Sequence, residues 1–242
     1  MKIYFIRHGD PDYANDTLTE RGWKEAEALS KRVAKLDVDK FYCSPLGRAR
    51  DTASLTLNKM GRTAVEYDWL QEFPPRILRP DVAPDRINAW DWLPEDWTAE
   101  PAFFDKNTWD LVEVMKEGHV GEMYQTVVQG LDKILSDHGY LREGLYYRTA
   151  KGNEDTLVFF CHFGVECVLL SHLMNISPMN LWHHMCAAPS SVTTVYTEER
   201  REGKVIFRVS SFGDISHLYA GGEEPSFAAR FCETFDSLER HD

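Results

Sequence analysis

The sequence predicts an α/β fold of three layers, in which helices cover both faces of a mostly parallel central sheet. Short apolar runs alternate with segments of helical periodicity through the first 70 residues, and such alternation favours parallel pairing of the strands. A continuous apolar run at residues 157–161 is typical of a strand buried on both faces. Hydrophobic residues make up 43% of the 242 residues, which is enough to enclose a core around such a sheet.

The first strand and the first helix are indicated by adjoining patterns. Residues 3–6 form an apolar run that ends at a charged residue, so we expect a buried strand there. Thr17 to Glu20 has the T-x-x-E form of a capping box, which predicts a helix over about 19–35. The apolar residues that recur at helical spacing, and therefore define its expected buried face, are Trp23, Ala26, Leu29, Val33 and Leu36.

The later elements continue the alternation around one interruption. A second strand is expected at 40–43, a helix opening after Pro45, and a third strand at 63–67. Beyond residue 118 the expected elements are a helix carrying Met123, Val127, Leu131 and Ile134, a strand at 157–161, a helix at 164–174, and an antiparallel hairpin formed by 191–197 and 204–211.

Residues 73–118 interrupt the alternation. They contain the tryptophans and prolines Trp90, Trp92, Trp97, Trp109, Pro74, Pro75, Pro80, Pro84, Pro94 and Pro101. The stretch is too aromatic for a solvated linker, and its prolines exclude one long regular element. We therefore expect an insertion, or cap, after the third strand, packed against the sheet edge within a single domain that spans residues 1–242.

The composition excludes several classes of function. A net charge of −12 opposes nucleic-acid binding, and no apolar run approaches the ~20 residues that a membrane span needs. The five cysteines are scattered, so neither a disulfide framework nor a zinc ribbon is indicated. Charged residues from Arg7 onward interrupt any signal-peptide core, and we expect a cytoplasmic protein.

Arginine and histidine follow three of the expected strands. Arg7-His8-Gly9 ends the first, Arg48 lies just beyond the second, and His162 directly follows the run at 157–161. Ligands of open α/β sheets bind outside the carboxyl ends of the strands. A guanidinium fork beside a nucleophilic imidazole nitrogen is suited to a phosphate group. Each feature alone is as consistent with a surface side chain, but their coincidence at three strand ends predicts a phosphate site.

Together these motifs give the chain a clear resemblance. It resembles the histidine phosphatase superfamily, whose members have the phosphoglycerate-mutase-like fold. The residues that carry the resemblance are Arg7-His8-Gly9, Leu18-Thr19-Glu20-Arg21-Gly22, Ser44-Pro45-Leu46-Gly47-Arg48-Ala49, Leu70-Gln71-Glu72, Cys161-His162 and Asp214-Ile215-Ser216-His217-Leu218.

The resemblance implies a role for each motif residue. His8 would attack phosphorus and form a phosphohistidine, while Arg7 and Arg48 would clamp the phosphoryl oxygens. His162 would donate to the same group, and Glu72 would protonate the leaving oxygen and later activate water. Two guanidiniums and an imidazole supply the positive charge, so no metal and no cofactor is implied.

Departures from the mutase pattern favour the phosphatase branch. Mutases usually follow Arg-His-Gly with Glu and then Trp-Asn, where this chain has Asp10, Tyr13 and Ala14. Asn15 fits the pattern only with a one-residue gap, and we expect Asn15 and Asp10 to border the phosphate. The prediction is a metal-independent phosphomonoesterase acting on a small phosphorylated metabolite. Mutase-type phosphoryl transfer and non-catalytic binding of a phospho-ligand remain open, as do the substrate and the oligomeric state.

Three arginines of the insertion allow two interpretations. Arg76, Arg79 and Arg86 would either extend the site toward a polyanionic or large substrate, or form a solvated loop paired to Asp81 and Asp85.

Overall fold

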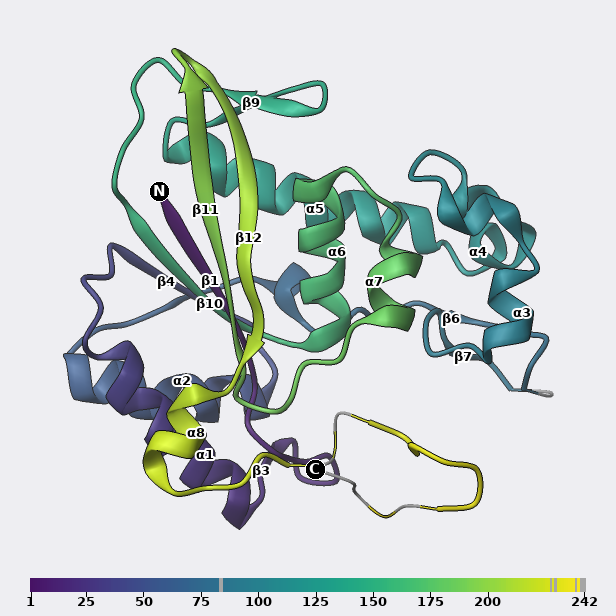
Figure 1. The fold of residues 1–242 in the computed structure, drawn as a ribbon, viewed down its shortest axis with the longest axis horizontal. Coiled ribbons are helices and arrows are strands. Elements are labelled where there is room, and N and C mark those ends of the chain that lie inside the picture. The colour runs from purple at the N-terminus through teal and green to yellow at the C-terminus, as the bar shows by residue number, and fades with distance from the viewer. Residues whose placement is uncertain (83–84, 227, 229, 238, 240–242) are drawn as a thin grey trace.

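A computed structural model describes residues 1–82, 85–226, 228, 230–237 and 239 of the chain. Figure 1 shows a large twisted sheet with helices on both of its faces. The strands of this eight-stranded sheet are, in spatial order, β5 (Val65–Glu66), β4 (Lys40–Cys43), β10 (Thr156–Cys161), β1 (Lys2–Arg7), β11 (Val192–Arg201), β12 (Lys204–Asp214), β9 (Tyr146–Arg148) and β8 (Leu141–Glu143).

The sheet combines a parallel block with an antiparallel extension. β5, β4, β10 and β1 pair in parallel, as predicted from the strand–helix alternation. β11 pairs antiparallel with β1, and β12, β9 and β8 follow by further antiparallel pairings. The α/β class and the hairpin of β11 and β12 are confirmed, whereas the short strands β8 and β9 were not predicted.

Two hydrophobic cores define the three layers. Successive side chains of a strand point to opposite faces of its sheet. Accordingly Leu157, Phe159 and Cys161 of β10 pack in one core, and Val158 and Phe160 pack in the other. The helices of the first face are α5 (Val120–Asp137), α6 (Phe163–Met174) and α7 (Pro178–His184), and those of the second are α1 (Glu20–Val33) and α2 (Gly47–Met60), with α8 (Ser216–Gly221) packed on α1. Among the described residues, no helix has both the length and the apolar character to cross a bilayer.

Helix α1 begins differently from the prediction. Its N-cap is Thr19, whose hydroxyl accepts a hydrogen bond from the Gly22 N–H at 3.1 Å. The predicted capping box at Thr17 is wrong because that residue lies in a two-stranded ribbon, β2 (Pro11–Asp12) and β3 (Thr17–Leu18), and its hydroxyl bonds Asp51. Trp23 is also not part of the buried face, since 39% of its surface is exposed.

The segment after β5 is built from short elements. They are the 3₁₀ turns Asp68–Leu70, Pro101–Phe104 and Trp109–Leu111, the ribbon β6 (Arg76–Ile77) with β7 (Ile87–Asn88), and the helices α3 (Pro94–Thr98) and α4 (Glu113–Glu117). Its tryptophans Trp90, Trp92, Trp97 and Trp109 are all buried. The Trp109 ring lies 5.8 Å from that of Trp182 on α7, so this segment packs beside α7. Pro84 lies outside the described residues.

Candidate active site

The structure brings three of the predicted motifs together at the carboxyl ends of neighbouring strands. His8 follows β1, Ser44 follows β4 and His162 follows β10, and these strands are adjacent in the order β4-β10-β1. Backbone hydrogen bonds hold the junctions in register, from His8 N to the Cys161 oxygen at 3.0 Å and from Ser44 N to the Phe160 oxygen at 2.9 Å. As a result the rings of His8 and His162 lie 5.0 Å apart. The predicted convergence of these side chains is present.

The hydrogen bond of His8 decides which of its ring nitrogens carries the proton. Nδ1 lies 2.7 Å from the carbonyl oxygen of Gly9, which can only accept. Nδ1 therefore bears the hydrogen in the neutral ring, and the lone pair is on Nε2. Gly9 is held in turn, because its N–H donates to Thr52 Oγ1 at 2.9 Å. His8 thus presents a basic nitrogen at the end of β1.

His162 has the opposite tautomer. Its Nε2 lies 2.7 Å from Ser44 Oγ, and the Leu46 N–H donates to that same hydroxyl at 3.2 Å. Among the described residues, His162 Nε2 is the one acceptor that the Ser44 hydroxyl hydrogen reaches, so the hydroxyl donates to it and the ring proton is on Nδ1. His162 Nδ1 is buried and has no hydrogen-bond partner among the described residues. It is a donor available to an anion.

Both imidazoles are uncharged at neutral pH. Burial is the main cause that lowers the pKa of His8 well below its usual value of 6.5, and the charges of Arg7 and Arg48 lower it further. Burial also lowers the pKa of His162 well below that value, together with the neighbouring His8, Arg48 and Arg7. The lone pair of His8 is therefore present without removal of a proton.

Two arginines supply the positive charge. Arg7 donates through NH1 to the Ala187 carbonyl oxygen, and Arg48 donates through NH1 to Asp16 Oδ1 at 2.6 Å. The Nε groups of Arg7 and Arg48 are buried and have no hydrogen-bond partner within the described part of the chain. Buried donors of a folded protein are nearly always paired. Together with His162 Nδ1, they form a set of unpaired donors suited to the oxygens of a phosphoryl group.

Asp16 fixes the start of α2, which carries Arg48. Its second oxygen accepts from the Gly47 N–H at 2.7 Å, so one carboxylate holds both the helix terminus and the guanidinium. Only glycine fits at position 47, since a Cβ there would lie 2.0 Å from the Asp16 carbonyl oxygen. The sequence analysis missed Asp16, because no local pattern links it to a helix more than 30 residues later.

Glu72 places a carboxyl group beside these charges. Its Oε1 accepts hydrogen bonds from the N–H groups of Phe73 at 2.9 Å and Val165 at 3.2 Å. Burial raises the pKa of Glu72, against the opposing effect of these bonds and of the charges of Arg7 and Arg48. A carboxyl group with a raised pKa keeps its proton to higher pH and is suited to general acid catalysis.

The backbone after His162 is adapted to this carboxyl group. His162 is extended and forms the N-cap of α6, so Phe163 is the first helical residue. A Cβ on Gly164 would lie 2.6 Å from Glu72 Oε1 and 3.0 Å from the Trp90 ring. Any larger residue at position 164 would therefore require the Glu72 carboxyl group or the Trp90 ring to move.

Asn15 is not brought to this cluster. It lies on an exposed turn, where its Nδ2 donates to Asp12 Oδ2 at 2.8 Å. Asp10 is also engaged elsewhere, because its carboxylate accepts from the hydroxyls of Thr19 and Ser226. The expected contact of Asn15 with phosphate therefore has no support from its position in this structure.

Further residues that the sequence analysis missed support the site from outside. Ser190 donates its N–H to the His8 carbonyl oxygen at 2.9 Å, and its hydroxyl lies 3.1 Å from His217 Nε2. Glu166 on α6 is buried, which raises its pKa to about 7 against a hydrogen bond from Thr193 and the charge of Arg7. The segment that contains His217 had been singled out only through the resemblance, and Glu166 carries no sequence signal.

The arginines of the insertion pair mainly within it. Arg79 is buried and forms two hydrogen bonds to Asp81, at 2.9 and 2.7 Å. Arg76 and Arg86 are exposed, and each donates to the other's carbonyl oxygen across the ribbon β6–β7. These contacts favour the loop interpretation, with Asp81 rather than Asp85 as the partner.

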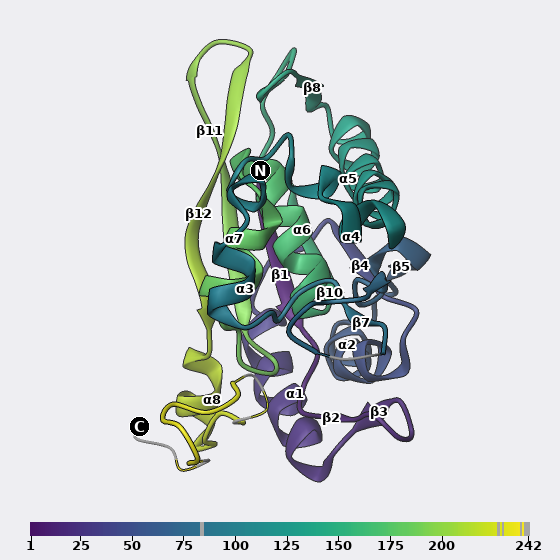
Figure 2. The ribbon, with the colours of Figure 1, turned by 90° about the vertical axis from the view of Figure 1, so that its right-hand side faces the viewer.

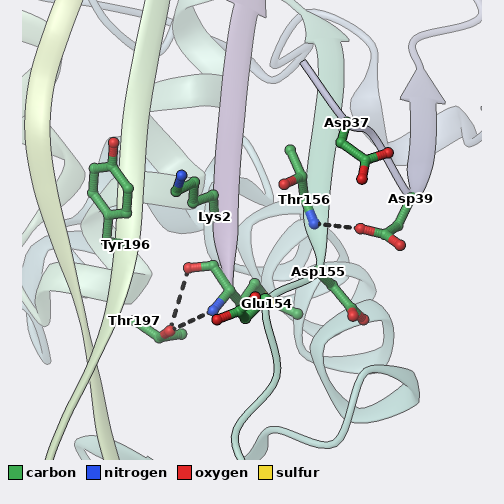
Figure 3. A pocket seen from close by; sticks show the side chains of 9 residues that line it. Lys2, Asp37, Asp39, Glu154, Asp155, Thr156, Tyr196 and Thr197 are labelled. Carbon is green, nitrogen blue, oxygen red and sulfur yellow. Dashed lines mark hydrogen bonds between the residues drawn. The ribbon is translucent and has the colours of Figure 1, made fainter.

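A separate cavity of about 600 Å³ lies at the other end of the sheet. Figure 3 shows acidic side chains around it, near Lys2 at the start of β1 and Thr156 at the start of β10. Its polar groups have structural partners: Asp39 accepts from the Thr156 N–H at 2.7 Å, and the terminal ammonium donates to Thr197 Oγ1 at 2.8 Å. The histidines and arginines of the candidate site do not line this cavity.

Comparison with known proteins agrees with the geometry. A family model described as histidine phosphatase superfamily (branch 1) matches residues 3–208. A probable phosphatase of Schizosaccharomyces pombe is 25% identical over 238 residues, covering 90% of this chain and 95% of the relative. The adenosylcobalamin/alpha-ribazole phosphatase of Salmonella typhi is 23% identical over 205 residues, or 76% and 84% of the two chains. The solved structure of Bacillus stearothermophilus YhfR has the same fold, with a TM-score of 0.57, 19% identity and coverage of 90% and 98%.

Proposed function

The chain belongs to branch 1 of the histidine phosphatase superfamily, and on that basis we propose that it hydrolyses phosphomonoesters of small molecules through a phosphohistidine at His8. The observation that carries the proposal is the pair of ring hydrogen bonds, which assign opposite tautomers to the two histidines. His8 has an unprotonated Nε2, and His162, 5.0 Å away, has an unpaired Nδ1–H donor. One ring is set up to attack an electrophile and the other to bind its oxygens.

The first step transfers the phosphoryl group to the enzyme. His8 Nε2 forms a bond to phosphorus while the bond from phosphorus to the ester oxygen breaks in line with it. Glu72 gives its proton to the departing oxygen, which leaves as the free alcohol. Arg7, Arg48 and His162 Nδ1 stabilise the charge on the phosphoryl oxygens during this transfer.

The second step regenerates the enzyme. The Glu72 carboxylate takes a proton from water as the water oxygen attacks phosphorus. The bond between phosphorus and His8 Nε2 breaks, the lone pair returns to the ring, and orthophosphate leaves. A mutase on the same scaffold would differ only here, because a second alcohol would replace water as the acceptor.

A substitution of the nucleophile tests the proposal. His8→Asn is expected to reduce hydrolysis of 4-nitrophenyl phosphate by at least about 10³-fold, since no other group of the site can form the intermediate. The matched control is His119→Asn, which changes an exposed imidazole at the N-cap of α5 and should leave the rate unchanged. Wild-type turnover should persist in EDTA. Substantial activity of His8→Asn would refute the proposal.

A further inference from the structure

Asp91 lies in the insertion in an unusual conformation. Its φ of +66° is in the left-handed region, which L-residues other than Asn, Asp and Gly adopt rarely. Both neighbours, Trp90 and Trp92, are buried, whereas Asp91 itself is half-buried. Its carboxylate forms no hydrogen bond and no ion pair with the described residues. The chain therefore holds a carboxylate in a fixed position without using it to stabilise the fold.

The neighbours of Asp91 connect it to the catalytic acid. The Trp90 ring and Glu72 Oε1 both lie within 3.0 Å of the point where a Cβ of Gly164 would be. The Trp90 ring also packs edge-on against Phe163, with 5.9 Å between centroids. Asp91 follows Trp90 directly, and its carboxylate interacts electrostatically with Glu72 and Arg7. Asp91 therefore directly follows the residue that packs beside Glu72, and its charge acts on the carboxyl group that would protonate the departing alcohol.

Arg79 holds this part of the insertion in place. Its guanidinium forms two hydrogen bonds to Asp81 and donates through NH1 to the Trp90 carbonyl oxygen. Asp81 also accepts from the Leu93 N–H at 2.9 Å. These bonds flank Asp91 on both sides along the chain. Because Asp81 neutralises Arg79 in a buried ion pair, the guanidinium does not neutralise Asp91 by a contact of its own.

The chemistry of Asp91 restricts what it can bind. Burial raises its pKa to about 6, against the charges of Arg79 and Arg7, so the group is an anion at neutral pH. An ionised carboxylate only accepts hydrogen bonds. It attracts hydroxyl and ammonium groups, and it repels a carboxylate of the substrate, which would also lose its water there.

From this arrangement we infer that Asp91 selects the leaving group of the substrate. It favours phosphate esters of alcohols that carry a further hydroxyl or ammonium donor, such as polyols and amino alcohols, and disfavours esters that carry a carboxylate. The inference rests on the proposed phosphatase function. It deepens that function, because it assigns the class of the substrate to one residue of the insertion.

Three esters of equal chain length test the inference through ratios of kcat/KM. They are glycerol 3-phosphate, with two hydroxyls, propyl phosphate, with none, and 3-phosphoglycerate, with a carboxylate. The wild-type protein should favour glycerol 3-phosphate over each of the others by about 10- to 100-fold, the range expected for a hydrogen bond to a charged group. Such ratios do not depend on the fraction of folded enzyme in a preparation.

Two variants separate charge from contact, and both fit the left-handed backbone. Asp91→Asn removes the charge. It should raise kcat/KM for 3-phosphoglycerate, relative to kcat/KM for glycerol 3-phosphate, by about tenfold or more. Asp91→Gly removes the side chain and should bring the ratio of glycerol 3-phosphate to propyl phosphate close to one. The control Asp85→Asn removes an exposed carboxylate from the same insertion and should keep the wild-type ratios.

The outcomes distinguish the inference from the function on which it rests. A wild-type preference for 3-phosphoglycerate, or ratios unchanged by both Asp91 variants, would overturn the inference while hydrolysis itself stands. If the wild-type protein hydrolyses neither these esters nor 4-nitrophenyl phosphate, the proposed function fails, and the inference fails with it.

Discussion

Single hydrogen bonds set the chemistry of the two histidines. A carbonyl oxygen contacts His8 Nδ1, and the Ser44 hydroxyl, which reaches no other acceptor among the described residues, contacts His162 Nε2. The same residue type thereby presents a lone pair in one position and an N–H donor in the other. Burial maintains both roles, because it lowers both pKa values and keeps the rings neutral.

The role of Glu72 predicts a pH dependence that varies with the leaving group. Its pKa is raised, so the proton is present at low pH and is lost as the pH rises through that pKa. The rate of phosphoryl transfer from alkyl phosphates should fall on the alkaline side. Glu72→Gln should remove this limb and reduce single-turnover rates on alkyl phosphates by about 10²- to 10⁴-fold. Nitrophenolate leaves without a proton, so the single-turnover rate of Glu72→Gln on nitrophenyl phosphate should fall much less.

Glu113→Gln is the matched control for this prediction, because it changes an exposed carboxylate of α4. It should retain the wild-type pH profile on both kinds of ester. Equal losses on alkyl and nitrophenyl phosphates in Glu72→Gln would instead mean that Glu72 positions the site and transfers no proton.

Site residues were predictable from the sequence where a side chain able to take part in catalysis follows directly after a strand. His8 and His162 each come within one or two residues of a buried apolar run, and parallel pairing brings such ends together. Asp16 and Asp91 were not predictable in the same way. Their positions depend on left-handed backbone conformations, at φ of +48° and +66°, and on partners distant in sequence.

At the scale of elements, the N-terminal turn of α6 is where the end of the sheet, the Glu72 carboxyl group and the insertion come into contact. Gly164 is the contact point, since Glu72 Oε1 and the Trp90 ring both lie within 3.0 Å of the position that a Cβ on Gly164 would take. Gly164→Ala would force a methyl group to within 2.6 Å of that oxygen unless the carboxyl group moved. A displacement of about 1 Å at a catalytic group can cost about 10²-fold in rate.

We therefore expect Gly164→Ala to lower kcat on alkyl phosphates by about 10- to 100-fold with a smaller loss on nitrophenyl phosphate. Gly221→Ala is the control, because it adds a methyl group to α8, away from the site, with its nearest contact at 3.3 Å. If Gly164→Ala has the same kinetics as the wild-type protein, the Glu72 carboxyl group does not need its observed position.

Elements with strong periodicity were predicted, and elements made by tertiary contacts were not. The helix α5 and the strand β10 follow from apolar spacing, and the helix α2 was expected after Pro45. The strands β8 and β9 are three residues each, and they form by pairing, β9 with β12 and β8 with β9. In the insertion, prolines and aromatic packing replace regular periodicity, so its short elements were not predictable.

At the scale of the molecule, segments from distant parts of the sequence lie together at the end of the sheet where the parallel strands have their carboxyl ends. Figure 2 shows α8, the ribbon β2–β3 and the C-terminal segment at the carboxyl end of β1. Ser226 bonds the carboxylate of Asp10, two residues after His8, so the C-terminal segment is attached beside the motif. Because the chain has a net charge of −12, Arg7 and Arg48 at this end of the sheet form a local region of positive charge. On the proposed function, a phosphorylated substrate binds a small cationic site in an acidic protein.

Trapping the intermediate tests the central claim most directly. Wild-type protein mixed with a ³²P-labelled phosphomonoester and quenched within one turnover should carry label that survives alkali and is lost in acid, as a phosphoramidate does. Peptide mapping under alkaline conditions should assign the label to His8, and His8→Asn should carry none. Label stable to acid, label on Cys43 or Ser44, or equal labelling of His8→Asn would contradict the account.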